Sequence, residues 1–230
     1  VPWTGGFDST YLVIKYLLEG EKVQPIYFSA VDKRGSEDIE MQALELLDKE
    51  IRESFPQISK NLKTTKIVTI DFIPEIEDKL VSLGGHGKSF KHPIGTQTAM
   101  MAHFCSYFKE PIYLAVEYAE SSIKPGEMSR TYKYFFKHLS FDKENCGFID
   151  EKKLKTEKDK LFLIYENLRF PVIDKTKADM YRDSERLGFK HILDTTWSCW
   201  YPERITNRGQ GCKICFACKG RIIPSGKYNK

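Results

Sequence analysis

The sequence predicts an α/β fold in which a mainly parallel, five-stranded sheet is covered by helices on both faces. Two observations lead to this prediction. Short apolar runs of strand length alternate with longer segments of helical period along most of the chain, and such alternation is typical of parallel sheets. The chain of 230 residues, 41% of them hydrophobic, is also long enough to bury the core that this sheet needs.

The first part of the chain runs from a glycine turn through helix, strand and helix. Residues 9–19 (STYLVIKYLLE) carry apolar side chains at helical spacing, and Gly20 is a suitable stop. Residues 23–29 (VQPIYFS) predict a short buried strand. Residues 36–55 predict a charged amphipathic helix that ends just before Pro56.

The same alternation continues toward the C-terminus. Three further strands are predicted at residues 66–72, 112–116 and 161–166. Three further helices are predicted at residues 97–108, 129–139 and 175–187. The first strand of the sheet is expected before the glycine turn, where only Val1-Pro2-Trp3 are present although a strand has roughly 5–6 residues. We therefore expect the native protein to carry a few further residues before Val1.

Charge and hydropathy argue against two classes of protein. The 36 basic and 32 acidic residues are interspersed and give a formal charge of only +4, so nucleic acid is not an expected partner. No stretch approaches the roughly 18 uncharged apolar residues of a spanning helix, and no charged-then-apolar leader is present. We expect a soluble, cytoplasmic protein that does not bind membranes.

Residues 4–10 (TGGFDST) form a glycine turn between the first predicted strand and the first predicted helix. Gly5 and Gly6 lack a Cβ, so the backbone can turn tightly and approach a ligand closely. Unpaired N–H groups at the helix start attract the negative charge of pyrophosphate, and the hydroxyls of Ser9 and Thr10 can add donors. A strand-to-helix connection without a ligand is the alternative, because short motifs give false positives. The predicted phosphate-binding residues are Thr4, Gly5, Gly6, Phe7, Asp8, Ser9 and Thr10.

Four of the six cysteines lie in the last part of the chain, at Cys199, Cys212, Cys215 and Cys218. Four thiolates close a tetrahedral zinc shell, and a closed shell has no open position for substrate, so we predict a structural zinc site. A redox Cys-x-x-Cys pair and an iron–sulfur cluster are the alternatives. We expect two parts, an α/β domain over residues 1–190 and a zinc-binding segment over residues 191–230 packed on it.

The glycine turn resembles the SGGxDS loop of PP-loop enzymes (N-type ATP pyrophosphatases), with Thr4 in place of the usual Ser. Three later segments are similar to the 7-cyano-7-deazaguanine synthases of that class. Residues 171–179 (PVIDKTKAD) resemble PLI-x-L-x-K-AEI, residues 195–199 (TTWSC) resemble TWSC, and residues 211–218 (GCKICFAC) resemble PCGxCxxC. The motifs follow one another in the order of that family, from Thr4 to Arg221.

The resemblance implies a PP-loop (HUP-like) fold and an enzyme that cleaves ATP between the α and β phosphates with the help of Mg²⁺. The carboxylate of 7-carboxy-7-deazaguanine would attack the α phosphate, giving an acyl-adenylate and pyrophosphate. Ammonia would then form an amide. A second ATP would activate the amide oxygen, and loss of AMP would leave the nitrile. The family resemblance also implies a homodimer.

Matched residues divide by role. The glycine turn would bind the ATP phosphates, and Phe28 and Ser29 at the end of the second strand would lie near the adenosine. Lys175 or Lys177 would neutralise phosphate charge as a catalytic residue. The alternative for both lysines is a solvated position at a helix start, because lysines are mostly exposed.

The middle of the chain departs from the family. Residues 92–97 (HPIGTQ) stand where the family has VPxRN, and Glu117 stands where His or Asn is usual. Glu120 would accept hydrogen bonds from a guanine-like edge, and Arg130 would pair with the substrate carboxylate in a substrate-binding and catalytic role. The alternative for both residues is an ordinary position on the protein surface.

Three other functions stay open. The first is a divergent ligase that adenylates another carboxylate, or that couples a deazaguanine acid to an amine on a protein. The second is a PP-loop tRNA-modifying sulfurtransferase, which usually needs a reactive cysteine pair and a basic RNA-binding surface. The third is a non-catalytic zinc module, which would not need the phosphate loop.

Overall fold

The computed structural model describes residues 1–29, 37–69, 110–118 and 135–197, together with the single positions 101, 104, 108 and 133. The chain divides into two compact units. One unit comprises Val1–Ile70 and Lys175–Lys230, and the other comprises Asp71–Asp174.

The sheet of the first unit is parallel. Strand β1 (Ile26–Ser29) pairs with β2 (Lys66–Thr69) over its whole length. On the other side of β1, the N–H of Trp3 donates to the carbonyl of Ile26 at 2.8 Å, and the N–H of Ile26 donates to the carbonyl of Val1 at 2.9 Å. Residues 1–3 therefore lie along β1 in the place where the sequence predicts the first strand.

Helix α1 (Phe7–Leu18) forms the centre of this unit. It is apolar on nearly every side, and its buried residues include Leu12, Val13, Ile14 and Leu17. Helix α2 (Glu37–Ser54) is amphipathic as predicted, because its buried residues Leu44, Leu47 and Ile51 share one face. A short 3₁₀ helix, η1 (Ile58–Asn61), leads from α2 toward β2.

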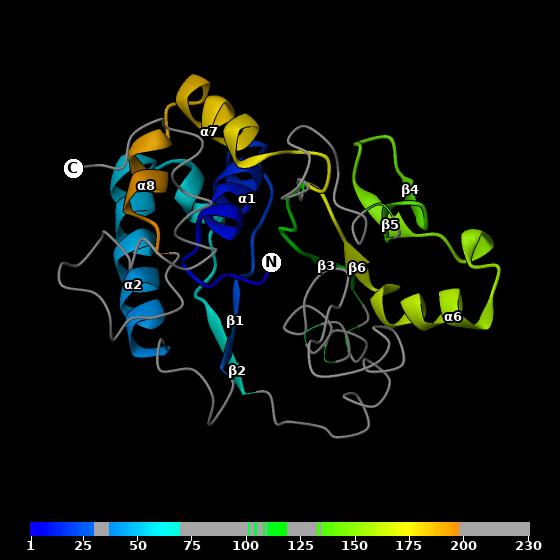
Figure 1. Cartoon of the computed structure of the whole chain (residues 1–230). Helices are drawn as coiled ribbons and strands as arrows, with labels where there is room; N and C mark the ends of the chain where they lie inside the picture. The colour runs from blue at the N-terminus through cyan, green and yellow to red at the C-terminus, as the bar shows by residue number, and fades with distance from the viewer. Residues whose placement is uncertain are drawn as a thin grey trace, which may run out of the picture. The chain divides into compact units, whose positions relative to one another are not determined.

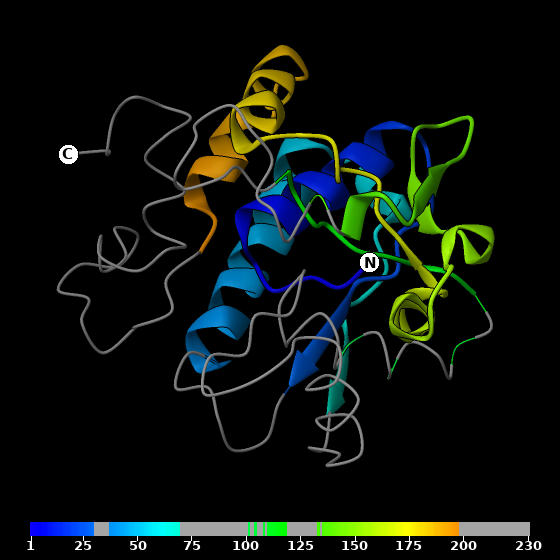
Figure 2. The same ribbon diagram turned by 45° about the vertical axis from the view of Figure 1, so that its right-hand side comes forward.

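Helices α7 (Lys177–Arg186) and α8 (Lys190–Thr195) complete the unit. Gly188, at φ +83°, separates them. Both ribbon views show α8 beside α2 (Figures 1 and 2), and the helices run antiparallel, because Thr195 donates to Glu50 at 2.9 Å while His191 lies 3.2 Å from Ser54. The sequence predicts α7 but not α8.

The second unit contains a parallel pair and a hairpin. Strand β3 (Ile112–Tyr113) pairs in parallel with β6 (Leu168–Arg169), and β4 (Leu139–Phe141) pairs antiparallel with β5 (Gly147–Ile149). A bridge from Gly147 to Phe170 joins the hairpin to the chain after β6. Three short helices follow β5: η2 (Glu151–Lys153), α6 (Glu157–Lys160) and η3 (Leu161–Tyr165).

Aromatic rings form the core of the second unit. Phe135, Phe162, Tyr165 and Phe170 are all buried. Phe135 meets Tyr165 and Phe170 edge to face, with ring centroids 5.7 Å and 5.4 Å apart. Edge-to-face contacts of this kind add stability beyond the burial of apolar area.

The strand predicted at residues 161–166 is wrong. The chain there forms a 3₁₀ helix, η3 (Leu161–Tyr165). A short apolar run carries no period that separates a buried strand from a buried helix. In the structure Phe162 and Tyr165 are both buried, and a spacing of three places them on one face of a 3₁₀ helix.

The mixture of helices with small parallel sheets is compatible with the predicted α/β fold. Among the described residues every sheet has two strands, so the five-stranded sheet is not established by them. No helix in the described part of the chain is both long and apolar enough to cross a bilayer.

Candidate functional site

The glycine turn has the backbone of an open helix start. Gly5 adopts φ +72°, and Gly6 is the N-cap of α1 with an extended backbone at φ −78° and ψ 163°. The first helical bond runs from the N–H of Thr10 to the carbonyl of Gly6 at 3.0 Å. Because the N-cap is a glycine, no capping side chain accepts a hydrogen bond from the N–H groups of the first turn. The turn therefore presents the positive end of α1, which is a suitable place for an anion.

Gly5 also lies close against α2. A Cβ at Gly5 would come within 3.2 Å of the Cβ of Ala43 and 3.6 Å of the carbonyl oxygen of Glu40. Glu40 is in turn held by the hydroxyl of Tyr27 on β1 at 2.9 Å. The missing side chain at position 5 therefore serves both the left-handed turn and the approach of α2.

The chain after α8 returns to the same turn. The N–H of Trp197 donates to the carbonyl of Gly5 at 2.9 Å, and the carbonyl of Trp197 lies 3.5 Å from where a Cβ of Gly6 would be. The indole Nε1 of Trp197 is buried and makes no hydrogen bond among the described residues. Residues far apart in sequence thus meet at the two glycines.

Asp8 and Lys177 form the charged part of the site. The Nζ of Lys177 donates to both carboxylate oxygens of Asp8, at 2.7 Å and 2.8 Å. The same ammonium lies 5.7 Å from the ring centre of Phe7. The side chains of Lys177 and Asp8 are 15% and 28% exposed. Asp8 is in the first turn of α1 and Lys177 is the first residue of α7, so the two helices meet at their N-terminal turns.

The hydroxyls of the turn are engaged in local contacts. Ser9 donates its hydroxyl to the carbonyl of Gly6 at 3.2 Å. Thr10 is fully buried, and its hydroxyl oxygen accepts from the indole Nε1 of Trp3 at 3.0 Å. Thr4 is half-buried beside them. In this structure Thr10 packs the base of the turn.

The start of α7 is strongly capped. Thr176 accepts from the N–H of Asp179 at 3.1 Å, and the carboxylate of Asp179 accepts from the N–H of Thr176 at 2.9 Å. This reciprocal pair is a capping box. It holds the backbone that carries Lys175 and Lys177 on either side of Thr176.

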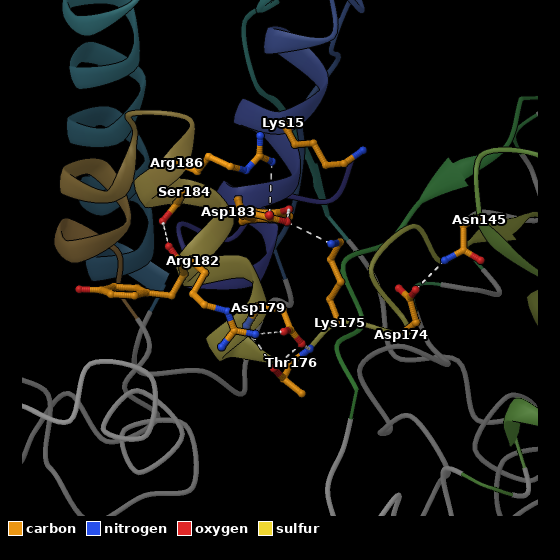
Figure 3. A network of polar contacts seen from close by, with 12 residues as sticks. Lys15, Asn145, Asp174, Lys175, Thr176, Asp179, Arg182, Asp183, Ser184 and Arg186 are labelled. Atoms are coloured by element: carbon orange, nitrogen blue, oxygen red, sulfur yellow. Dashed lines mark hydrogen bonds and ion pairs between the residues drawn. The ribbon is translucent and has the colours of Figure 1, made fainter. Parts of the chain in front are cut away.

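Lys175 takes part in a different network from Lys177. Its Nζ donates to Oδ2 of Asp183 at 3.0 Å, and Arg186 approaches the other oxygen of that carboxylate at 3.4 Å (Figure 3). The buried hydroxyl of Tyr11 donates to the same Oδ2 at 3.0 Å. Burial works to raise the pKa of Asp183, but the hydrogen bonds from Lys175 and Tyr11 outweigh it and lower that pKa below its usual value. Burial, followed by the neighbouring Asp183 carboxylate, raises the pKa of Tyr11.

Phe28 and Ser29 are the last residues of β1, at the carboxyl end of the parallel strands, where the glycine turn also begins. Phe28 is buried and pairs with Val68, while Ser29 is half-buried and pairs with Thr69. Parallel strands bring their carboxyl ends to one edge. The structure therefore places Phe28 and Ser29 at the same edge as the glycine turn.

Several predicted site residues lie outside the described residues, so the structure does not test them. They are Glu120, Arg130, Cys199, Cys212, Cys215 and Cys218. Within the described ranges no group of three or more His, Cys, Asp or Glu side chains is arranged to hold a metal ion. The zinc site remains a prediction from the cysteine spacing.

Sequence reasoning did not single out Tyr11, Asp183 or the backbone role of Trp197. Tyr11 and Asp183 belong to segments correctly predicted as helices, but nothing in their local pattern marks a contact across 172 positions. Trp197 carries a usable signal, because it lies in the TTWSC segment that resembles a family motif.

A comparison with protein families gives one match. Residues 156–224 match the family described as Queuosine biosynthesis protein QueC. That segment contains Lys175, the helix α7 that begins with Lys177, Trp197 and the four clustered cysteines, whereas the glycine turn lies before it. No curated protein matches the chain. The family match supports the assignment of this chain to the QueC-like PP-loop family.

Proposed function

We propose that this chain is an ATP-dependent synthase that converts 7-carboxy-7-deazaguanine and ammonia into 7-cyano-7-deazaguanine. The substrate carboxylate attacks the α phosphate of ATP, the bond to the β phosphate breaks, and pyrophosphate leaves. Ammonia displaces AMP to give the amide. A second ATP transfers its AMP group to the amide oxygen, and loss of that AMP gives the nitrile. The match of residues 156–224 to a queuosine biosynthesis family supports this role.

The observation that carries the proposal is the meeting of two helix starts at the glycine turn. Asp8 in the first turn of α1 contacts Lys177, the first residue of α7, at 2.7 Å. The positive ends of both helix dipoles and the Lys177 ammonium therefore meet at the first turn of α1. Preorganised positive charge of this kind stabilises a departing pyrophosphate.

The chain offers further residues for the other parts of the substrates. We assign the ATP phosphates to residues 4–10, with Lys177 as the lysine that faces them, and the adenosine to Phe28 and Ser29. Glu120 reads the guanine-like edge, and Arg130 pairs with the substrate carboxylate. This assignment keeps residues 1–190 as the ATP-binding domain of a cytoplasmic homodimer.

Metal ions enter the proposal in two places. Mg²⁺ accompanies the ATP phosphates, since it prefers oxygen ligands and water. Zinc, held by Cys199, Cys212, Cys215 and Cys218, would pin the segment of residues 191–230. Metal analysis of the purified protein should give about one zinc per chain, and a Cys212→Ser variant should lose it; a metal-free wild type would exclude the structural site.

Product analysis tests the proposed reaction. Purified protein is incubated with ATP, ammonia and 7-carboxy-7-deazaguanine, and the products are separated by mass spectrometry. We expect the nitrile together with AMP and pyrophosphate, and none of them from a Gly6→Val variant, whose side chain crowds the turn. AMP without amide or nitrile would refute this substrate assignment while leaving ATP use intact.

A second candidate is adenylation of a different carboxylate, or coupling of a deazaguanine acid to an amine on a protein. Residues 92–97 and Glu117 favour it, because they depart from the family where the substrate would be read. Release of AMP with another acid, or with a protein amine in place of ammonia, would support this candidate.

A further inference from the structure

Asp8 presents a problem for any phosphate-binding turn, because a carboxylate repels phosphate. The structure shows what the carboxylate contacts: both of its oxygens accept hydrogen bonds from the Nζ of Lys177. We propose that Asp8 is a positioning residue that holds the Lys177 ammonium at the first turn of α1, so that Asp8 favours phosphate binding only through Lys177. This inference rests on the proposed function only in that the glycine turn binds the ATP phosphates.

The position of Lys177 is unfavourable by local rules. It is the first residue of α7, where the helix dipole opposes a positive side chain. It is also only 15% exposed, and withdrawing an ammonium from water costs free energy unless an acid partner compensates. The capping box of Thr176 and Asp179 forms without it. Helix formation therefore does not require a lysine here, which points to a role in binding.

The neighbouring lysine serves as an internal comparison. Lys175 is committed to Asp183, a carboxylate that also accepts from Tyr11 and lies near Arg186. That network ties α7 to α1 through Tyr11. Asp8, in contrast, is separated from Gly6 only by Phe7. Of the two lysines, Lys177 is the one whose ammonium is held next to the turn.

A carboxylate that acts through a lysine has a distinct thermodynamic signature. If Asp8 only orients Lys177, removing the carboxylate after Lys177 is already gone causes no further loss of phosphate affinity. If Asp8 contacts the ligand or its metal ion directly, removing its carboxylate lowers ATP affinity by the same factor in the wild type and in the Lys177→Met variant. If Asp8 acts only as a repelling charge, its loss tightens binding.

Calorimetric titration with ATP alone, without the acid or ammonia, tests these alternatives. Asp8→Asn and Lys177→Met should each weaken ATP binding by roughly tenfold, equivalent to about 1.4 kcal/mol, and the double variant should bind ATP no more weakly than Lys177→Met, because the unpaired carboxylate that repels phosphate is removed as well. Asp8→Glu, which keeps a carboxylate, should recover most of the affinity. The matched control is Asp48→Asn on α2, which removes a carboxylate that accepts two hydrogen bonds from Arg52 at 2.7 Å and 3.1 Å and should leave ATP binding unchanged.

A second measurement needs no nucleotide. Brief acetylation followed by mass spectrometry reports how readily each lysine reacts. Asp8→Asn should raise the reactivity of Lys177 and not of Lys175, whereas Asp183→Asn should do the opposite. Unchanged labelling of Lys177 in Asp8→Asn overturns the positioning role.

The titration can overturn the inference in two ways: tighter ATP binding by Asp8→Asn, or a double variant that shows the full sum of the single losses. These failures differ from failure of the proposed function. A wild type that binds ATP but makes no nitrile refutes only the reaction. A wild type that does not bind ATP refutes the phosphate site, and the labelling test then still decides whether Asp8 holds Lys177.

Discussion

The hydroxyl of Tyr11 donates a 3.0 Å hydrogen bond to Oδ2 of Asp183, although 172 positions separate the two residues in sequence. Tyr11 is fully buried in α1, and Asp183 lies on α7. Because Lys175 bonds the same oxygen, this single carboxylate joins the helix that begins at the glycine turn to the helix that carries Lys177. It therefore helps to hold the two N-terminal turns together.

Asp183→Asn should destabilise the protein at neutral pH and make its free energy of unfolding depend less on pH in the acid range. The folded-state pKa of Asp183 lies below its ordinary value of 3.8, so its contribution is complete above about pH 4 and is lost as the pH falls through the folded-state pKa. Since the side chain is 27% exposed, we expect a loss of only about 1 kcal/mol at pH 7. Urea unfolding between pH 2.5 and 7 measures the difference.

In that series the gap between wild type and Asp183→Asn should close at the acid end. Glu19→Gln, which removes the exposed partner of Lys15, is the control and should change stability little at any pH. A gap that stays constant down to pH 2.5 would contradict a lowered pKa at Asp183.

Gly5→Ala should cost more stability than the same change at Gly20. Both glycines have positive φ, +72° and +86°, and an alanine there costs about 1–2 kcal/mol for the backbone alone. At Gly20 nothing lies within 4 Å of an added Cβ, whereas at Gly5 the Cβ of Ala43 is 3.2 Å away. Crowding should add about 1–3 kcal/mol at Gly5. Urea unfolding of both variants gives the comparison, and equal losses would show that α2 moves aside freely.

Thr176→Ala should weaken both the fold and ATP binding. It removes the capping box at the start of α7, which contributes about 0.5–2 kcal/mol, and frays the turn that carries Lys177. Thr156 and Asp159 in the second unit exchange the same two hydrogen bonds, so Thr156→Ala is a matched control. It should lower stability by a similar amount without changing ATP affinity. Loss of ATP affinity in Thr156→Ala, or none in Thr176→Ala, would argue against a local effect at α7.

His138 should make the second unit sensitive to mild acid. Its ring is almost completely buried against Phe162, and Nε2 lies 3.2 Å from Asp159. Burial lowers the pKa of His138 below 6.5, although the charge of Asp159 works in the opposite direction, and the nearby Lys137 and Lys153 add positive charge. The stability due to the neutral ring is therefore complete above about pH 6.5 and is lost as the pH falls toward the folded-state pKa, with a slope of at most about 1.4 kcal/mol per pH unit.

Thermal unfolding between pH 5 and 8 checks this expectation against His138→Gln, whose side chain does not titrate. The wild type should lose more stability below pH 6.5 than the variant. Parallel curves, or a His138 resonance that titrates at or above pH 6.5 in the folded protein, would contradict the lowered pKa.

Particular elements show which features can be read from the sequence. The helices α1, α2 and α7 lie within two residues of the predicted ranges, because the 3.6-residue repeat of apolar side chains is a local signal. The strand predicted at residues 161–166 is a 3₁₀ helix, because a six-residue apolar run lacks such a period. Helix α8, with six residues, is too short to show one.

The sequence by itself determined the α/β alternation, the open helix start at Gly5 and Gly6, and a cysteine spacing suited to zinc, since each depends on neighbours in the chain. Only the tertiary structure decided that Lys177 contacts Asp8 while Lys175 contacts Asp183. Both lysines lie within three residues of each other, and either could have faced the turn. The packing of α7 on α1 decides which lysine contacts Asp8. The paired side chains are 169 and 172 positions apart in sequence, so they meet only when the core that joins those helices has formed.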